Sequence, residues 1–400
     1  MSYGDKRTYR QYANAFSQLP MPYAYLDLEY LRYNITDILN RSGQKQVRIA
    51  SKSIRSVSVL RYILERDCRF SGVMCYSAQE AVCLAERGLD DLLIGYPVWN
   101  EESIRAICCL VKQGKTIVFM VDDVKHVDRI AYFAREEQVV LPVCLDIDMS
   151  TQLCGLYFGV RRSPVRSVGE AVTMAEYILS QPFIRLEGLM GYEAQIAGVG
   201  DHTPKQALKN MIITYLKRRS IEEIANKRLE LAYELKKRDI HFRFFNGGGT
   251  GSLHSTCKED VINEVTVGSG FYGPALFDSY RDFQCAPAAG YAIEIVRLPK
   301  EGVFTCHGGG YTGSGATGTD KLPQPYLPLG SRLLAQEGAG EVQTPIMYKG
   351  EERLQLGDPV FMRHSKAGEL CERFKTLHCY EYGQITGQIK TYRGEGWCFV

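Results

Sequence analysis

The sequence VRIASKSIR, residues 47–55, places a single lysine, Lys52, directly after a short apolar run. A short β-prone run bounded by polar residues predicts a buried strand, and α/β folds keep reactive groups at the carboxyl ends of their strands. A lysine there suits a Schiff base. For one strand taken alone, a solvated lysine is the more frequent case, because most lysines are exposed. The rest of the chain therefore decides between the two interpretations.

A regular alternation of strand-like and helical runs surrounds this stretch. Amphipathic helices are predicted between the strands, for example at residues 78–87, 101–112 and 124–137. Eight strands alternating with helices favour a parallel sheet, and eight strands close a (β/α)8 TIM-type barrel. The predicted strands are residues 47–51, 72–76, 91–96, 116–121, 140–147, 186–192, 242–246 and 261–267.

Two regions depart from this alternation. Residues 196–238 hold a long charged segment whose apolar positions fit helices with one apolar face; a lid, a subunit contact and a plain barrel helix are all compatible with it. Residues 277–400 are rich in glycine and tyrosine and contain short β-like runs, the clearest at 291–297, 302–306, 360–363 and 384–391. We therefore expect an N-terminal segment (1–22) joining a C-terminal β domain (277–400), with the barrel at 23–276.

Composition excludes several classes of protein. The 400 residues carry a net charge of +2 with scattered basic side chains, so nothing indicates nucleic acid or an anionic membrane as a partner. The first ten residues are polar, and no run approaches the length of a membrane span. Thirteen cysteines occur without a Cys-x-x-Cys pair, which favours reduced thiols over a disulfide framework or zinc site. These features predict a cytoplasmic globular protein.

A glycine-rich loop follows the seventh predicted strand. Residues 246–252 read NGGGTGS, in which glycines let the backbone approach an anion and the hydroxyls of Thr250 and Ser252 can donate hydrogen bonds. Such a run is a weak signal alone, since turns also use glycine. Its position strengthens it, because α/β barrels commonly bind phosphate after strands seven and eight. Residues 268–270, Gly-Ser-Gly, would close the same cradle.

A lysine after strand one and a phosphate cradle after strands seven and eight are what pyridoxal phosphate requires. At these positions the sequence resembles the fold-type III pyridoxal phosphate enzymes, within them the D-threonine aldolase and D-serine dehydratase group, whose barrel is shared with alanine racemase. The resemblance covers about residues 20–280. Its matching pieces are ASKS at 50–53, LMGYE at 189–193, NGGGTG at 246–251, and EVTVGSG at 264–270 with Tyr272.

The resemblance implies a set of functional residues. Lys52 would carry the cofactor, Tyr192 would serve both cofactor binding and catalysis, and His364 and Lys366 would be catalytic. It also implies a homodimer with shared active sites and a small amino-acid substrate. The further cofactor-binding residues would be Asn246, Gly248, Gly249, Thr250, Gly251, Gly268 and Ser269.

This chain departs from the family pattern at two places. Family members carry a His-x-Cys or His-x-Asp pair for a divalent metal, whereas here His364 is followed by Lys366, and a protonated lysine cannot ligate a metal. The metal is therefore doubtful: Glu369 could replace the missing ligand, or Lys366 could contact a substrate carboxylate or transfer a proton. The arginine that meets the cofactor ring nitrogen in the family is also missing from residues 146–155, the next arginines being Arg161 and Arg162, and no group is assigned to that nitrogen.

These features predict an aldolase or a dehydratase/deaminase that acts on a D-amino acid, with a β-hydroxyl group whose proton His364 helps to remove. Aldol cleavage is slightly favoured. A racemase that uses Lys52 and a tyrosine on the opposite ring face is one alternative. A non-catalytic pyridoxal phosphate carrier is another, although single-barrel carriers lack a C-terminal domain of this length.

Overall fold

The computed structural model describes residues 6–153, 155–315, 318–366 and 368–400, which form two compact units. The barrel unit comprises Leu39–Ser51, Leu60–Val267 and Phe399–Val400. The sheet unit comprises the described residues of Met1–Ile38, Lys52–Val59 and Gly268–Cys398. The chain passes from the first to the second between Ser51 and Lys52, and each unit is described by itself below.

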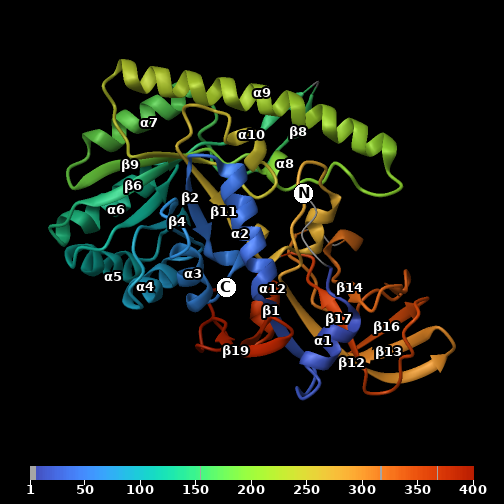
Figure 1. The fold of residues 1–400 in the computed structure, drawn as a ribbon. Coiled ribbons are helices and arrows are strands. Elements are labelled where there is room, and N and C mark those ends of the chain that lie inside the picture. The colour runs from blue at the N-terminus through green and yellow to red at the C-terminus, as the bar shows by residue number, and fades with distance from the viewer. Residues whose placement is uncertain (1–5, 154, 316–317, 367) are drawn as a thin grey trace. The chain divides into compact units, whose positions relative to one another are not determined.

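The barrel unit contains a closed barrel of eight parallel strands, as the sequence predicts (Figure 1). Their order around the barrel is β10-β11-β2-β3-β4-β5-β6-β9. The apolar interior includes Val118, Met120 and Phe244, and Gly188 must lack a side chain because a Cβ would lie 2.2 Å from the Phe244 ring. The strands are β2 (Gln46–Ala50), β3 (Phe70–Cys75), β4 (Leu92–Pro97), β5 (Ile117–Val121), β6 (Leu141–Asp146), β9 (Ile184–Met190), β10 (Phe244–Gly247) and β11 (Glu264–Val267).

Helices alternate with the barrel strands, the first of them lying before β2, and polar residues fix where several of them begin. Asn100 Oδ1 accepts a hydrogen bond from the Ser103 backbone N–H (2.9 Å) at the start of α5, and Asp123 caps α6 in the same way. A hairpin of β7 (Thr151–Leu153) and β8 (Leu156–Phe158) precedes α7. The helices are α2 (Leu28–Ser42), α3 (Val57–Leu64), α4 (Ala78–Glu86), α5 (Glu101–Lys112), α6 (Val124–Glu136), α7 (Val168–Ser180), α8 (Ala194–Ala197) and α10 (Leu253–Thr256).

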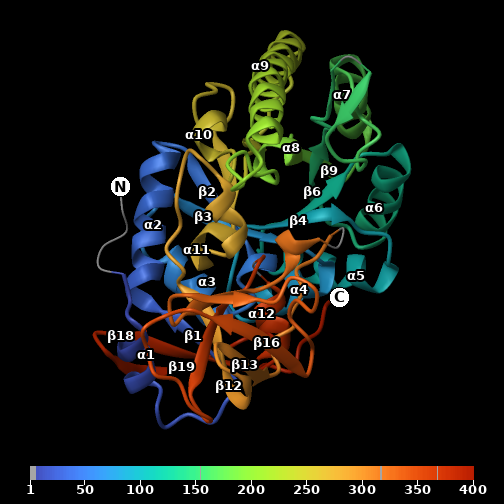
Figure 2. The same cartoon turned by 90° about the vertical axis from the view of Figure 1, so that its right-hand side faces the viewer.

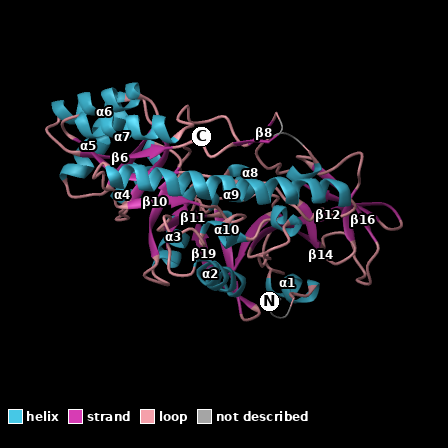
Figure 3. Ribbon diagram, turned by 90° about the horizontal axis from the view of Figure 1, so that it is seen from above, coloured by secondary structure: helices cyan, strands magenta, loops and turns pink. Residues whose placement is uncertain are grey.

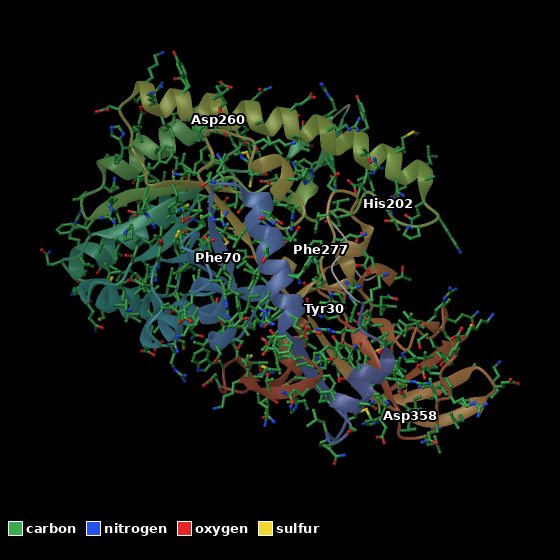
Figure 4. All side chains as sticks on the ribbon, viewed as in Figure 1. Tyr30, Phe70, His202, Asp260, Phe277 and Asp358 are labelled. Atoms are coloured by element: carbon green, nitrogen blue, oxygen red, sulfur yellow. The ribbon has the colours of Figure 1, made fainter. Side chains whose placement is uncertain are left out.

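The long charged segment forms one helix, α9 (Ala207–Lys237), which runs beside α7 (Figures 2 and 3). Arg238, just past its end, forms an ion pair with Glu176 of α7 (3.2 Å). His202 lies in the loop that leads into α9 (Figure 4). The first turns of α9 expose large apolar side chains, those of Leu208, Met211, Ile212 and Tyr215.

The sheet unit is built on nine strands in the order β15-β16-β13-β12-β1-β18-β19, with β17 pairing with β12 and β14. Tyr12, Phe16 and Phe361 belong to its aromatic core. The strands are β1 (Tyr23–Asp27), β12 (Ala289–Lys300), β13 (Val303–His307), β14 (Gln324–Leu327), β15 (Ser331–Leu333), β16 (Gln343–Tyr348), β17 (Pro359–Arg363), β18 (Thr376–Glu381) and β19 (Gln384–Lys390). The helices and turns are α1 (Tyr9–Ala15), η1 (Ser51–Ser53), α11 (Ser269–Tyr272), η2 (Ala275–Ser279), η3 (Thr319–Lys321) and α12 (Glu369–Arg373).

Strand β1 departs from the predicted boundaries, which place residues 23–27 with the barrel. All five of its residues are buried, and Tyr25 lies opposite Gly290 of β12 and His378 of β18. A short, fully buried strand has the same sequence pattern in either sheet, so the pattern could not show which partners it takes. The predicted domain division stays a prediction.

Within the described parts of the chain, no helix combines the length and apolar character needed to cross a bilayer. The described cysteines are all free thiols.

Candidate active site

The predicted site residues are divided between the two units. Lys52 opens a short segment of the sheet unit immediately after Ser51, the residue that follows β2. The barrel unit holds Tyr192, Asn246, Gly248, Gly249, Thr250 and Gly251, and the sheet unit holds Lys52, Gly268, Ser269, His364 and Lys366.

In the barrel unit, the carboxylate of Glu193 organises the glycine loop that follows β10. It accepts hydrogen bonds from the Gly248 backbone N–H (3.1 Å), from Ser252 Oγ (2.6 Å) and from Thr256 Oγ1 (2.5 Å). Ser252 Oγ also accepts the Gly249 N–H (3.0 Å). The hydroxyl proton of Ser252 is therefore directed to the Glu193 carboxylate in this structure, and its donation to a bound phosphate stays a prediction. The loop is held in place by its own protein partners.

A buried cation supports Glu193 from the neighbouring helix α9. The guanidinium group of Arg228 donates to Glu193 and to the Gly191 carbonyl, and it pairs with Glu259 Oε1 (2.6 Å). Burial by itself would raise the pKa of Glu193, but Arg228 and the hydroxyl and backbone donors bring that pKa below its ordinary value. This pair could not be predicted from the sequence, because Arg228 lies in the long charged segment among many exposed basic residues.

The ring of Tyr192 lies beside the backbone of Gly249 in the glycine loop. A Cβ at Gly249 would lie 3.2 Å from the Tyr192 ring and 2.9 Å from Ala197 Cβ, so no side chain fits at this position. Burial, and then the charge of Glu193, raise the pKa of Tyr192 to about 12. The phenol therefore keeps its proton near neutral pH and can donate a hydrogen bond. A backbone without side chains beside a phenol donor fits a bound phosphate group.

Asn246 and Arg41 have structural contacts near the loop. The Asn246 amide donates to Glu264 Oε1 and to Thr266 Oγ1, both at 2.8 Å, inside the barrel. Arg41 Nη1 donates to the Thr250 carbonyl (3.2 Å). Asn246 thus ties β10 to β11, and Arg41, which the sequence analysis did not select, supports the loop from α2.

A cavity of about 520 Å³ lies in the barrel unit at the carboxyl ends of β4, β5, β6 and β9. Its lining includes Tyr192, whose side chain also lies beside Gly249 of the glycine loop. Asp122 there lies 3.0 Å from His126 Nδ1. Burial, and then the nearby charge of Asp122, raise the pKa of Asp146 to about 7. The cavity thus combines aromatic walls with a carboxyl group that titrates near neutrality.

In the sheet unit, the segment that begins at Lys52 packs against residues 368–372. A Cβ at Gly368 would lie 2.4 Å from the Lys52 carbonyl oxygen, so only glycine allows this approach. Arg55 Nε donates to the same carbonyl (2.8 Å), and Arg55 Nη1 pairs with Glu372 (2.6 Å). Tyr272 Oη donates to the Ile54 carbonyl (3.0 Å). The backbone of the lysine is therefore fixed while its side chain is exposed.

Ser269 joins this arrangement through Ser53. Their hydroxyl oxygens lie 3.0 Å apart, and Ser269 begins the short helix α11 directly after Gly268. The structure thereby connects the predicted strand-eight residues with the segment that carries Lys52.

His364 and Lys366 lie in different environments. His364 is 2% exposed, and within the described residues neither of its ring nitrogens has a partner at normal hydrogen-bond geometry, although a backbone contact with Ala289 acts to raise its pKa. Burial, and then the charge of Arg363, lower its pKa to about 3, so the imidazole is neutral.

Lys366 Nζ donates to the Ser314 carbonyl (3.2 Å). Its pKa is lowered by burial and by the charge of Lys321, with a smaller contribution from Lys52, which places Lys366 within electrostatic reach of Lys52.

The residues near His364 do not fit a divalent metal. Among the described residues, no group of three or more possible ligands from His, Cys, Asp and Glu comes together. Glu369, the candidate replacement ligand, accepts the Ser314 N–H at Oε1 (2.8 Å). The cation at this place in the chain is instead the ammonium group of Lys366.

Residues 26–275 match the family model of the alanine racemase N-terminal domain. The chain is 25% identical over 257 residues to a 3-hydroxy-D-aspartate aldolase of Paracoccus denitrificans (strain Pd 1222), a match that covers 63% of this chain and 60% of that protein. A second 3-hydroxy-D-aspartate aldolase of Paracoccus denitrificans is 26% identical over the same shares. The match therefore spans less than two thirds of these relatives.

Solved structures resemble the fold over nearly the whole chain. D-threonine aldolase from Filomicrobium marinum aligns with a TM-score of 0.78 at 16% identity, covering 95% of this chain and 96% of that one. D-threo-3-hydroxyaspartate dehydratase from Delftia sp. HT23 aligns at 0.70 with 17% identity, covering 94% and 98%. Alanine racemase of Clostridium difficile 630 aligns at 0.63 with 14% identity, covering 93% and 99%. These similarities confirm a barrel with a β domain.

Proposed function

The chain belongs to the alanine racemase N-terminal domain family, and on that premise we propose that it is a pyridoxal phosphate-dependent lyase acting on a β-hydroxylated D-amino acid. One observation carries the proposal. The barrel holds a bare glycine loop, organised by Glu193, after β10, and its strand β2 leads into Lys52. Strand ends of one parallel barrel meet at one end, where such folds carry their chemistry.

Two groups of residues would hold the cofactor. Lys52 supplies the amine for its aldehyde, and the backbone of the loop, with Thr250 and Tyr192, supplies donors for its phosphate. When bound, this cofactor supplies an electron sink for bond breaking at the substrate α-carbon. The other proposed cofactor-binding residues are Asn246, Gly248, Gly249, Gly251, Gly268 and Ser269, with Asn246 acting through the barrel interior.

The chain's own side chains would then act on the substrate. The Lys366 ammonium group attracts an anionic oxygen, either the substrate carboxylate or the β-oxygen as it loses its proton. His364 stays neutral, so a ring nitrogen can accept the hydrogen bond of the β-hydroxyl. The Tyr192 phenol keeps its proton and donates rather than accepts. Because Lys366 occupies the second ligand position, no step is assigned to a metal.

Aldol cleavage and dehydration would use the same groups. If the bond between the α- and β-carbons breaks, glycine and an aldehyde form. If the α-hydrogen and hydroxide leave, a keto acid and ammonia form. The relatives are named both as aldolases and as a dehydratase, and we favour aldol cleavage.

We further propose a cytoplasmic homodimer, since the family resemblance implies one and α9 exposes apolar side chains that a subunit contact would cover.

The test begins with near-ultraviolet and visible absorbance of the purified protein with added pyridoxal phosphate, before and after borohydride, beside Lys52→Ala. We expect a band in the wild type that borohydride removes and that the variant lacks. D- and L-β-hydroxy amino acids are then assayed for aldehyde, ammonia and optical rotation. Absence of the band in the wild type overturns the proposal. Loss of rotation without aldehyde or ammonia would indicate a racemase, and a bound cofactor without turnover would indicate a carrier.

A further inference from the structure

One side chain, that of Tyr192, separates the glycine loop from the cavity of the barrel unit. Tyr192 contacts the space beside Gly249 and also lines the cavity. A cofactor whose phosphate lies at the loop therefore extends its ring past Tyr192 toward the ends of β4, β5 and β6. This step rests on the proposed function, because it needs the loop to bind the phosphate of pyridoxal phosphate.

The order of the strands indicates which part of the ring faces which strand. In pyridoxal phosphate the ring nitrogen lies para to the carbon that carries the aldehyde, so the two point in opposite directions. β2, which leads into Lys52, and β6 are four strands apart in either direction around the eight-stranded barrel. A ring whose aldehyde points to the end of β2 directs its nitrogen to the end of β6. The last residue of β6 is Asp146, and it lines the cavity.

Charge distinguishes Asp146 from its neighbours. Asp122 lies beside His126 (3.0 Å), and Asp148 accepts from Ser150 Oγ (2.6 Å) and lies 3.5 Å from Arg166. Among the described residues, by contrast, Asp146 has no basic side chain within ion-pair distance, although the charge of Arg162, which lines the same cavity, partly offsets the rise in its pKa. Burial and the charge of Asp122 raise its pKa to about 7. The ionised form of a carboxyl group in this position is stabilised by an N–H donor that carries positive charge.

We infer that the Asp146 carboxyl group hydrogen-bonds the ring nitrogen of the cofactor and keeps a proton on it. The carboxyl oxygen and the ring nitrogen share one proton. This proton resides on the nitrogen, because the negative charge of the carboxylate stabilises the positive charge of the protonated ring. A protonated ring nitrogen withdraws electrons more strongly, which supports bond breaking at the substrate α-carbon. Asp146 thereby fills the position for which residues 146–155 offer no arginine.

The test compares two ligands that differ at one atom. Apoprotein is titrated with pyridoxal phosphate and with its 1-deaza analogue, in which carbon replaces the ring nitrogen, and binding is followed by protein fluorescence. For wild type we expect pyridoxal phosphate to bind about 10- to 100-fold more tightly than the analogue, the range of one charge-assisted hydrogen bond. Asp146→Asn should lose most of that difference by weakening pyridoxal phosphate while leaving the analogue within about 2-fold of wild type.

Asp122→Asn is the matched control, because it removes a neighbouring cavity carboxylate and should leave the preference for the ring nitrogen in place. Equal binding of both ligands by wild type, or an equal loss of both in Asp146→Asn, overturns the inference while leaving the proposed function intact. If neither ligand binds wild type, the proposed function itself fails. Analogue binding also verifies that the Asp146 variant is folded.

Discussion

The glycine loop of the barrel unit and the segment 364–369 of the sheet unit contrast in how their polar groups are satisfied. In the loop, Glu193 receives three hydrogen bonds and a buried arginine. In the segment, both ring nitrogens of His364 lack partners at normal hydrogen-bond geometry among the described residues, and Lys366 lies within electrostatic reach of a second lysine. In the first region the Glu193 carboxylate is fully engaged by protein groups, whereas Arg228 Nε and Glu259 Oε2 behind it lack partners among the described residues.

This difference indicates that the loop serves as a scaffold and that the segment 364–369 contacts the substrate. Buried polar groups are nearly always paired, so the loop behaves as rigid scaffold. An unpaired buried imidazole costs stability that a partner would restore, which makes the segment the place where a substrate contributes missing contacts.

The largest effect is expected for Glu193→Gln. It leaves Arg228 buried with a weaker set of partners, so the free energy of unfolding should fall by about 3–5 kcal/mol, as measured by urea denaturation. Arg105→Gln removes a partly exposed arginine paired with Glu101 and Glu137 and should cost under about 1 kcal/mol. Equal losses in the two variants would show that the Glu193 pair does not organise the loop.

Lys366→Met should lower kcat/KM by about 10- to 100-fold, because it removes a charge-assisted hydrogen bond to an anionic oxygen. Lys321→Met is the control, since Lys321 already pairs with Asp320. We expect a chelator to leave wild-type activity unchanged. Abolition of activity by the chelator, with recovery on adding a divalent ion, would mean that a metal acts here despite Lys366.

His364 should make stability depend on pH. Its pKa falls from 6.5 to about 3 on folding, so the unfolded chain binds more protons between these values and stability is lost as pH falls through that window. The slope attributable to one group is about 1.4 kcal/mol per pH unit. His364→Gln should remove it from urea unfolding midpoints measured across the window, whereas the exposed His241→Gln should not. An unchanged slope in His364→Gln would contradict the neutral imidazole.

The smallest effect is expected for Gly248→Ala. Gly248 has φ of +78°, so an alanine there should cost about 1–2 kcal/mol through backbone strain alone. Gly387→Ala is the control, because its φ is not positive and nothing lies within 4 Å of the added Cβ. If thermal unfolding does not separate the two variants, the loop is less rigid than its contacts indicate.

Several features could be predicted from the sequence because they depend on local pattern. All eight barrel strands overlap the short apolar runs that predicted them between the helical segments. The glycine loop could be recognised because its glycines are consecutive in the sequence. The sequence also showed that residues 146–155 lack an arginine. Strands β14, β15, β16 and β18 were missed, since short strands among turn residues carry little periodicity.

The class of fold, the lysine after β2 and the glycine loop after β10 could all be predicted without coordinates, since each follows from side-chain periodicity or from residues adjacent in the chain. The three-dimensional structure was needed to show that Glu193 and Arg228 hold the loop and that Gly368 admits the Lys52 backbone. These are contacts between residues distant in sequence. Their partners are chosen by burial and charge in three dimensions, which no local pattern records.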